Sequence, residues 1–501
     1  MTSDKQVKAS HRNTPGSDAF RAFIASGWAS RSTEPVPRAE VADHAARRRA
    51  AVSERFPGER LVIPAGGLKV RSNDTDYTFR AHTAFAYLTG LGADSEPDSV
   101  LVLDPKPEGG GHEAILFFRP LAARDTEEFF ADARFGEFWV GPRPTIQDIE
   151  SRLGVGARHI DSLPDTLAKD AGAVQIRVVR AADDQVARRV DEVRAEAATS
   201  ASGPTEADEE LARFLSGMRI CKDEWEIGEM RRAIAATHQG FESIIVGLPE
   251  AVRKGRGERW VEGLFGLYAR HEGNGVGYES ICASGDHANT IHWTKNTGQV
   301  REGDLMLIDA GVELDSLYTA DITRTLPVNG RFTEVQRKIY EAVLEAQEAG
   351  MAAVKPGNKF SDIHAAANRV IARKLHEWGL LPDGVTLEQT LDPENGGWHR
   401  RWMVHGTSHH LGMDVHDCQM LLRKDYMDGE LKPGMILTVE PGLYFKADDL
   451  VAPEEFRGIG VRIEDNVLVT QDGHENLSSA MPRTADDVEA WIARVQSGAD
   501  E

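Results

Sequence analysis

The chain alternates short apolar runs with longer segments in which apolar residues recur at helical spacing. Residues 61–63, 100–103 and 114–118 are apolar runs separated by turns that contain glycine and proline, and they predict β-strands. Apolar spacing typical of helices begins at about Asp223 and recurs over residues 333–354 and 361–378. The mixture predicts an α/β or α+β fold.

Differences in composition along the chain predict its domain organisation. Residues 1–37 are polar and rich in serine, threonine, proline and arginine, which predicts a flexible N-terminal extension. Residues 195–210 are small, acidic and interrupted by Gly-Pro, which is typical of an interdomain linker. A chain of 501 residues is long enough for two domains with separate cores. We therefore expect an N-terminal domain over residues 38–205 and a second domain over residues 206–501.

Two strand-like runs in the second half of the chain lead into aspartates. LMLIDAG (residues 305–311) leads into Asp309, and Asp321 follows in ADITRTLPV. Strand alternation places Asp321 on the same face as Thr323 and Thr325. A carboxylate at the edge of a core is costly unless a positive group compensates it. A bound cation and a buried arginine both meet this need, so each aspartate taken alone leaves the two interpretations open.

Histidines and two further carboxylates follow in three short motifs. HGTSHHLGMDVHD (residues 405–417) contributes four histidines: His405, His409, His410 and His416. Imidazole is the commonest metal ligand in proteins. MILTVEPGLYF (residues 435–445) leads an apolar run into Glu440. In GIGVRIEDNVLVT (residues 458–470), alternation places Arg462 and Glu464 on one face, which is typical of a ligand beside a cation or of an exposed ion pair.

Taken together, four carboxylates and one imidazole predict a site for divalent cations. The set comprises Asp309, Asp321, His409, Glu440 and Glu464. Its donors are mostly oxygens, which suit Mn²⁺, Co²⁺ or Zn²⁺. Because carboxylates are in excess, two of them can bridge a pair of ions, and a water held between two ions becomes hydroxide near neutral pH.

Charge and cysteine usage argue against several other classes. A net charge of -22 argues against nucleic acid and anionic membranes as partners. Cys221, Cys282 and Cys418 show no CxxC spacing, which fits a reducing compartment and excludes a thiolate zinc site. The first residues lack the apolar core of a signal peptide, and no apolar run is long enough to span a bilayer. We therefore expect a cytoplasmic protein.

These motifs in combination resemble the creatinase-like "pita-bread" metallopeptidases, and most closely their Xaa-Pro aminopeptidase (aminopeptidase P) branch. The resemblance covers about residues 40–495 and rests on LMLIDAG, YTADITRT, HGTSHHLGMDVHD, TVEPGLY and RIED. It implies a creatinase-like N-terminal domain with a mixed sheet, followed by a pita-bread catalytic domain. It also implies two divalent metal ions, with Mn²⁺ expected first and Co²⁺ or Zn²⁺ as the alternatives.

The resemblance implies a role for each ligand. Asp309 would chelate one ion, and His409 and Glu440 would chelate the other. Asp321 and Glu464 would bridge the two ions. Glu440 would also take a proton from the attacking hydroxide or water and pass it to the leaving nitrogen.

Further residues receive roles from the same resemblance. His292, in TIHW, and His416, in DVHD, match family histidines that contact the substrate near the scissile bond. His405 and Arg462 match residues that support the catalytic site, and Tyr444 matches one that lines the substrate pocket. In the first half, RSNDTDYTFRAHTAFAYLTGL (residues 71–91) is similar to an aminopeptidase P segment. That similarity places Asp74 near an active site, which in some members belongs to a neighbouring subunit.

The implied activity is hydrolysis of the bond between an N-terminal residue and a following proline, by a hydroxide that bridges the two ions. The substrates would be peptides with proline at the second position, and the protein would be a homodimer or homotetramer. A prolidase-type dipeptidase is the alternative, since the ligands are common to both. A creatinase or a non-catalytic binding module is disfavoured because all five ligands are present. The chain has no GxSxG, Walker or HExxH motif.

Overall fold

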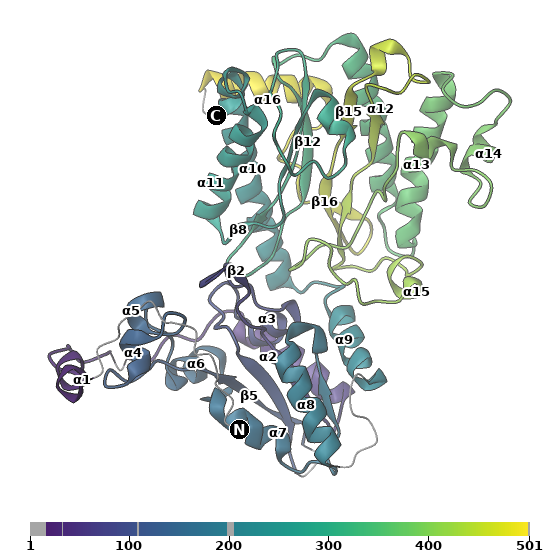
Figure 1. The fold of residues 1–501 in the computed structure, drawn as a ribbon. Coiled ribbons are helices and arrows are strands. Elements are labelled where there is room, and N and C mark those ends of the chain that lie inside the picture. The colour runs from purple at the N-terminus through teal and green to yellow at the C-terminus, as the bar shows by residue number, and fades with distance from the viewer. Residues whose placement is uncertain (1–16, 33, 108–109, 198–204, 499–501) are drawn as a thin grey trace, which may run out of the picture. The chain divides into compact units, whose positions relative to one another are not determined.

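The computed structural model describes residues 17–32, 34–107, 110–197 and 205–498. Two compact units make up the chain (Figure 1). The first contains Met1–Leu91 and Ser95–Asp208, and the second contains Gly92–Asp94 and Glu209–Glu501. Within the predicted extension, residues 1–16 and 33 lie outside the described part, whereas Asp18–Ala25 form helix α1 behind the N-cap Ser17.

The first unit is built on a five-stranded mixed sheet with the order β6-β5-β4-β1-β7. The strands are β1 (Arg60–Pro64), β4 (Val100–Pro105), β5 (His112–Phe118), β6 (Gly156–His159) and β7 (Ile176–Val178). β4 pairs antiparallel with β1 and β5, whereas β6 and β7 pair parallel at the two edges. The three strands predicted from apolar runs are thus confirmed, and Val62, Val102 and Phe117 lie in the core of this unit.

The helices of the first unit are short. They are α2 (Ala42–Arg55), α3 (Thr83–Thr89), α4 (Glu127–Ala131), α5 (Glu137–Val140), α6 (Ile146–Leu153), α7 (Leu163–Ala168) and α8 (Asp184–Glu196). A small hairpin of β2 (Val70–Ser72) and β3 (Thr75–Asp76) carries Asp74 in its turn. Helix α9 (Glu206–Met218) begins within the predicted linker (residues 195–210), of which residues 198–204 lie outside the described part.

The second unit repeats one arrangement, a helix pair followed by a small antiparallel sheet. The first pair is α10 (Glu224–Arg253) and α11 (Gly257–Glu272), and its sheet has the order β12-β10-β9. The second pair is α12 (Glu334–Ala353) and α13 (Phe360–Glu377), and its sheet has the order β13-β16-β17. In Figure 1 the strands lie between the two helix pairs. This repeat is structural, since no fixed period marks it in the sequence.

The strands of the two sheets carry the predicted motifs. They are β9 (Ile281–Ser284), β10 (Leu305–Ala310), β12 (Ile322–Pro327), β13 (Ile436–Val439), β16 (Asp465–Val469) and β17 (His474–Asn476). Two-stranded ribbons flank them: β8 (Gly275–Val276) with β11 (Val312–Glu313), and β14 (Gly442–Phe445) with β15 (Ile459–Arg462). The remaining helices are α14 (Leu387–Leu391), α15 (Arg423–Tyr426) and α16 (Ala485–Ser497).

Side-chain caps explain where the long helices begin. Asp223 accepts hydrogen bonds from the first turn of α10 and forms a capping box with Glu226. Thr333 forms the same arrangement with Gln336 at the start of α12. The predicted starts of these helices are therefore confirmed. In the part of the chain that the structure describes, no helix is long and apolar enough to cross a membrane.

A buried ion pair joins the two sheets of the second unit. Arg324 on β12 and Asp465 on β16 are both 0% exposed, and Arg324 Nη2 donates to Asp465 Oδ1 at 2.7 Å. Arg324 Nη1 also donates to the carbonyl of Glu464, at 2.7 Å. Three further side chains donate to or pair with Asp465 Oδ2: Gln347, Asn476 and Arg483. The charges are thus fully compensated inside the core, as a buried ion pair requires.

Replacing Arg324 by methionine should lower the free energy of unfolding of the second unit by about 3–5 kcal/mol, because Asp465 would stay buried without its main partner. Arg231→Met is the matched control, since Arg231 and Glu475 form a half-exposed pair on the same unit. That substitution should cost less than about 1 kcal/mol. Urea unfolding followed by tryptophan fluorescence measures both values. Equal losses of unfolding free energy would show that the buried ion pair of Arg324 contributes no more than the exposed pair of Arg231.

Candidate metal centre

The two sheets deliver one pair of carboxylates each to the same place. Asp309 lies on β10, and Asp321 directly precedes β12; the two strands pair so that Asp309 faces Thr323. Glu440 directly follows β13, and Glu464 directly precedes β16, with Val439 facing Asp465. Both sheets therefore end in two acidic residues at a strand junction. The four carboxylates therefore lie at strand ends, at the edge of the core, as the sequence predicts.

His409 reaches this position because its segment runs along β13. The backbone of His409 pairs with that of Thr438, through a 2.9 Å bond from Thr438 N to His409 O, and its N–H donates to the Thr438 hydroxyl at 3.1 Å. The next residue, His410, is bridged to Leu437, and Leu411 N donates to Ile436 O at 3.0 Å. The imidazole of His409 is thereby held at the strand end that carries Glu440.

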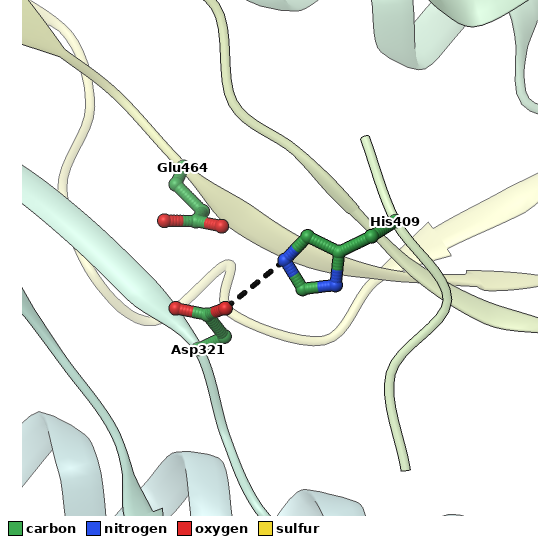
Figure 2. Close-up of side chains that lie close together, drawn as sticks. All are labelled: Asp321, His409 and Glu464. Atoms are coloured by element: carbon green, nitrogen blue, oxygen red, sulfur yellow. Dashed lines mark ion pairs between the residues drawn. The ribbon is translucent and has the colours of Figure 1, made fainter. Parts of the chain in front are cut away.

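Asp321 occupies the middle of the cluster. Its Oδ2 lies 3.2 Å from His409 Nε2, and its Oδ1 lies 2.5 Å from the Tyr278 hydroxyl. Figure 2 shows Asp321, His409 and Glu464 directed toward one another from three different segments. One ligand atom from each of these three residues lies within 4.8 Å of the others. Glu440 Oε1 lies 3.6 Å from His409 Nε2, which brings the fourth side chain to the same imidazole.

Burial and mutual repulsion shift the proton affinities of the cluster. Burial first, and then the charges of Asp321, Glu440 and Asp309, hold the pKa of Glu464 well above its usual range. Burial also raises the pKa of Glu440 to about 7. Burial alone would lower the pKa of His409, but its hydrogen bond to Asp321 and the charge of that residue raise it to about 9. The positive groups near the cluster therefore do not balance the negative charge of its carboxylates.

Tyr278 links the two aspartates and was not found from the sequence. Its hydroxyl lies 2.7 Å from Asp309 Oδ1 and 2.5 Å from Asp321 Oδ1. Burial and the two negative charges hold the pKa of this phenol well above its usual range, so it keeps its proton. A phenol has a single O–H, which cannot donate to both oxygens at once. The sequence around Tyr278, GNGVGY (residues 273–278), gives no sign of this contact, because Asp309 and Asp321 lie in other segments of the chain.

Arg462 is buried beside the cluster and balances part of its charge. It is 2% exposed, and its Nη2 donates to Asp309 Oδ2 at 2.5 Å. Its Nε donates to the Thr323 hydroxyl at 3.1 Å, and Thr323 donates to Glu464 Oε2 at 2.7 Å. The arrangement agrees with the first interpretation of the RIED motif, a candidate ligand beside a cation: Glu464 faces the cluster and Arg462 is its neighbour. An exposed ion pair is excluded, since Glu464 is 1% exposed.

His405 and Tyr444 lie behind Arg462. The Tyr444 hydroxyl lies 2.7 Å from His405 Nε2 and accepts from Arg462 Nη1 at 3.1 Å. Burial, followed by the charge of Arg462, lowers the pKa of His405 to about 3, so its imidazole is neutral. Tyr444 is 4% exposed and is absent from the described residues that line the cavity. The Tyr444 hydroxyl is thus held between His405 and Arg462, and its contact with substrate stays a prediction.

The cluster opens into a cavity of about 290 Å³. His292 and His416 are exposed and line it, together with apolar side chains such as Ile291 and Val415. The rings of His416 and His409 lie 4.4 Å apart between centroids. Both predicted substrate histidines therefore border the same space as the carboxylates. Asp74 belongs to the first unit, and its contact with substrate stays a prediction.

A second buried ion pair holds the segment that carries His409 and His416. Arg219 Nε donates to Asp417 Oδ1 at 2.9 Å, and the two residues are 8% and 1% exposed. Asp417 N donates to His410 O at 3.0 Å, which closes the loop between the two histidines. Sequence reasoning missed Arg219, since its partner is almost 200 positions away and no local pattern connects them.

The donor set fits divalent cations. Four carboxylates face one guanidinium, that of Arg462, and all three nitrogens of Arg462 already donate to other groups. Oxygen donors with one imidazole suit hard or borderline divalent ions. The single O–H of Tyr278 can donate to only one of Asp309 and Asp321 at a time. A cation bound by both aspartates would compensate both. The residues that would hold such ions are Asp309, Asp321, His409, Glu440 and Glu464.

Comparison with known proteins places this geometry in context. Residues 228–471 match Metallopeptidase family M24, and residues 44–179 match the aminopeptidase P N-terminal domain. The chain is 51% identical to Xaa-Pro aminopeptidase 1 of Streptomyces coelicolor over 484 residues, which cover 96% of this chain and 94% of that protein. It is 33% identical to Xaa-Pro aminopeptidase of Escherichia coli, over 89% of this chain and 96% of that one.

Solved structures agree with these sequence matches. Aminopeptidase PepP of Pseudomonas aeruginosa superposes with a TM-score of 0.77 and 31% identity, covering 92% of this chain and 99% of that chain. A variant of Escherichia coli aminopeptidase P in complex with substrate superposes with a TM-score of 0.79 and 30% identity, covering 93% and 100% of the two chains.

Removing a residue that only hydrogen-bonds to a metal ligand typically weakens metal binding by roughly 10- to 100-fold. Because Asp321 is a proposed ligand itself, Asp321→Asn should weaken Mn²⁺ binding by more than this. The amide keeps the size of the side chain and removes the charge that faces both His409 and Tyr278. Asp315→Asn is the matched control, since Asp315 is exposed in the turn before Asp321. Isothermal titration calorimetry on the two folded variants measures the difference, and equal affinities would show that Asp321 is not a ligand.

Proposed function

The chain belongs to metallopeptidase family M24, and from this membership we propose that it cleaves the bond between an N-terminal residue and a following proline. It is a metal-dependent aminopeptidase with an aminopeptidase P N-terminal domain and a pita-bread catalytic domain. The observation that carries the proposal is the convergence of Asp309, Asp321, His409, Glu440 and Glu464 in a chain half identical to a Xaa-Pro aminopeptidase.

Two divalent ions are the proposed cofactors, with Mn²⁺ preferred over Co²⁺ or Zn²⁺. When bound, such a pair lowers the pKa of the attacking water and polarises the scissile carbonyl. The two oxygens of Asp321 face different partners, one toward Tyr278 and Asp309 and the other toward His409. This orientation supports the bridging role of Asp321, with Asp309 on one side and His409 and Glu440 on the other.

Glu440 is the proposed proton carrier. Its Oε1 lies 3.2 Å from the Thr438 hydroxyl, which orients the carboxylate at the end of β13. From this place Glu440 takes a proton from the attacking water and passes it to the leaving nitrogen. The leaving group is the imide nitrogen of proline, which has no proton of its own and therefore depends on this delivery.

Four residues around the cluster have supporting roles. His292 and His416 border the cavity and donate to the oxygen that becomes negative when the carbonyl is attacked, where fixed donors help most. Arg462 neutralises part of the charge at Asp309. His405 acts through Tyr444, since its Nε2 lies 2.7 Å from that hydroxyl, which accepts from Arg462.

The charges of the cavity favour an aminopeptidase over a prolidase-type dipeptidase. A dipeptide places its C-terminal carboxylate just beyond the proline, where a free cation would be needed to bind it. Among the described residues that line the cavity, Arg462 is the one lysine or arginine, and its nitrogens are engaged by Asp309, Thr323 and Tyr444. A longer peptide presents no charge at that position.

Cellular location and assembly are part of the same proposal. The three cysteines are free thiols, which suits a reducing compartment such as the cytoplasm. A homodimer or homotetramer follows from the family resemblance. Size-exclusion chromatography with light scattering distinguishes these assemblies from a monomer.

Exhaustive chelation should abolish peptidase activity on a Xaa-Pro-Yaa peptide, because the carboxylate cluster provides no nucleophile without a cation. Adding Mn²⁺ should restore it. The control is the same chelator saturated beforehand with Mn²⁺, which should leave the activity unchanged. Full activity in protein shown by elemental analysis to be free of metal would refute the metal-dependent mechanism.

Peptides of three or more residues should be cleaved with a higher kcat/KM than Xaa-Pro dipeptides. One added backbone hydrogen bond beyond the proline contributes about 1 kcal/mol, and avoiding an unpaired carboxylate adds to this, so a difference of about tenfold or more is expected. Steady-state kinetics on metal-loaded protein measures it. Peptides with alanine in place of proline should be poor substrates. A preference for the dipeptide would identify a prolidase and leave the metal site unaffected.

A further inference from the structure

The segment that carries His292 connects two strands of the catalytic unit and has little regular structure. It leaves β9 at Ser284, forms the short 3-10 helix Gly285–Asn289, and continues without helix or strand to Leu305, where β10 begins. His292 lies in the irregular part and is exposed at the cavity. An irregular segment needs anchors outside itself if one of its side chains is to keep a fixed position.

One buried carboxylate, that of Glu258, contacts this segment along its whole length. Its Oε1 accepts from Ser284 N at 2.9 Å and lies 2.7 Å from His287 Nδ1. Its Oε2 accepts from Trp293 Nε1 at 2.9 Å and from Gly298 N at 2.5 Å. The four donors come from the start, the middle and the end of the segment. Because an ionised carboxylate only accepts hydrogen bonds, His287 Nδ1 carries the proton.

Glu258 is 0% exposed, although within the described part of the chain its partners are N–H groups rather than lysine or arginine. A buried carboxylate is costly unless hydrogen bonds or charges compensate it. The four donors supply most of this compensation. Glu258 also lies in the first turn of α11, where the helix dipole favours a negative charge. The hydrogen bonds of Glu258 therefore depend on the present path of the segment.

Gly298 shows how closely the segment approaches this carboxylate. Glu258 N donates to Gly298 O at 3.2 Å, so the two residues are hydrogen-bonded in both directions. A Cβ on Gly298 would lie 2.7 Å from Glu258 Oε1 and 2.6 Å from His287 Nδ1. The contact excludes any larger residue at this position. A second anchor, Asn296, is 0% exposed and bonds to Cys282 N and Ser280 O through its side chain.

The contact with Trp293 transmits this anchoring to the neighbouring residue. The Trp293 ring stacks on His287 with 3.9 Å between centroids, and its indole N–H donates to Glu258. With one face of its ring on His287 and its N–H on Glu258, Trp293 fixes the backbone from which His292 projects. We propose that Glu258 is a positioning residue that sets the place of His292 at the cavity, although Glu258 is not among the residues that line it.

Glu258 has this role only if His292 contacts the substrate as proposed above.

The experiment is a double-mutant cycle on the full-length, metal-loaded protein. It compares the parent, Glu258→Gln, His292→Ala and the double variant, with kcat and KM for a Xaa-Pro-Yaa peptide, bound metal and thermal midpoint as readouts. Glutamine keeps the size of the side chain, but its amide nitrogen cannot accept from two of the four donors. Glu262→Gln is the control, on the same helix and half-buried.

Glu258→Gln should lower kcat by roughly 10- to 100-fold, as a misplaced catalytic group does, while the bound metal is unchanged. Glu262→Gln should stay within about twofold of the parent. In the His292→Ala background, Glu258→Gln should change kcat by less than about twofold, because the group it positions has been removed. The thermal midpoint should fall by the same amount in both backgrounds, since the hydrogen bonds are lost in both.

An equal loss of kcat in the two backgrounds would overturn the positioning role and leave the function of His292 intact. Parental kcat in His292→Ala would instead refute the role of His292, and with it that of Glu258, while peptide cleavage and metal dependence stand. If Glu258→Gln is not obtained folded, Trp293→Phe takes its place in the cycle, since it removes one donor to Glu258. If Trp293→Phe lowers kcat equally in the parent and in His292→Ala, the positioning role of Glu258 is overturned.

Discussion

Repulsion among carboxylates is the constraint around which the catalytic unit is built. Asp309, Asp321, Glu440 and Glu464 lie at the edge of the core, where burial and the neighbouring carboxylates raise the pKa of Asp321, Glu440 and Glu464. Arg462, His409 and the Tyr278 hydroxyl compensate only part of this charge. Divalent ions would supply the remaining positive charge, so the repulsion among these carboxylates favours metal binding.

Strand alternation lets the same two strands serve the site and the core. Thr323 and Glu464 face the cluster and hydrogen-bond to each other, whereas their neighbours Arg324 and Asp465 form the buried ion pair. The pair holds β12 against β16, and these strands belong to different halves of the structural repeat. Candidate ligands from both halves thereby reach one place, and Arg324 contacts this place through the backbone carbonyl of Glu464.

Buried polar anchors outside the sheets hold the segments that carry the histidines of the cavity. Asp417 and Arg219 fix the loop between His409 and His416, and Glu258 binds the segment of His292. A loop of this kind forms few apolar contacts of its own, so hydrogen bonds to a buried charge are what define its path. Glu258 lies in helix α11, Arg219 directly follows helix α9, and the segments that they hold present His292 and His416 to the cavity.

The sequence by itself was enough to predict the candidate ligands and most of the local structure. Apolar runs that lead into Asp309 and Glu440 predict the strand ends, and Asp223 and Thr333 predict the helix starts, because caps and strand alternation depend only on near neighbours. Tyr278 and Glu258 left no such pattern. Their partners are supplied by segments that meet only when the sheets and helices pack. Which side chains balance the buried charge was therefore decided by the tertiary structure, since electrostatic compensation depends on distance in space and not along the chain.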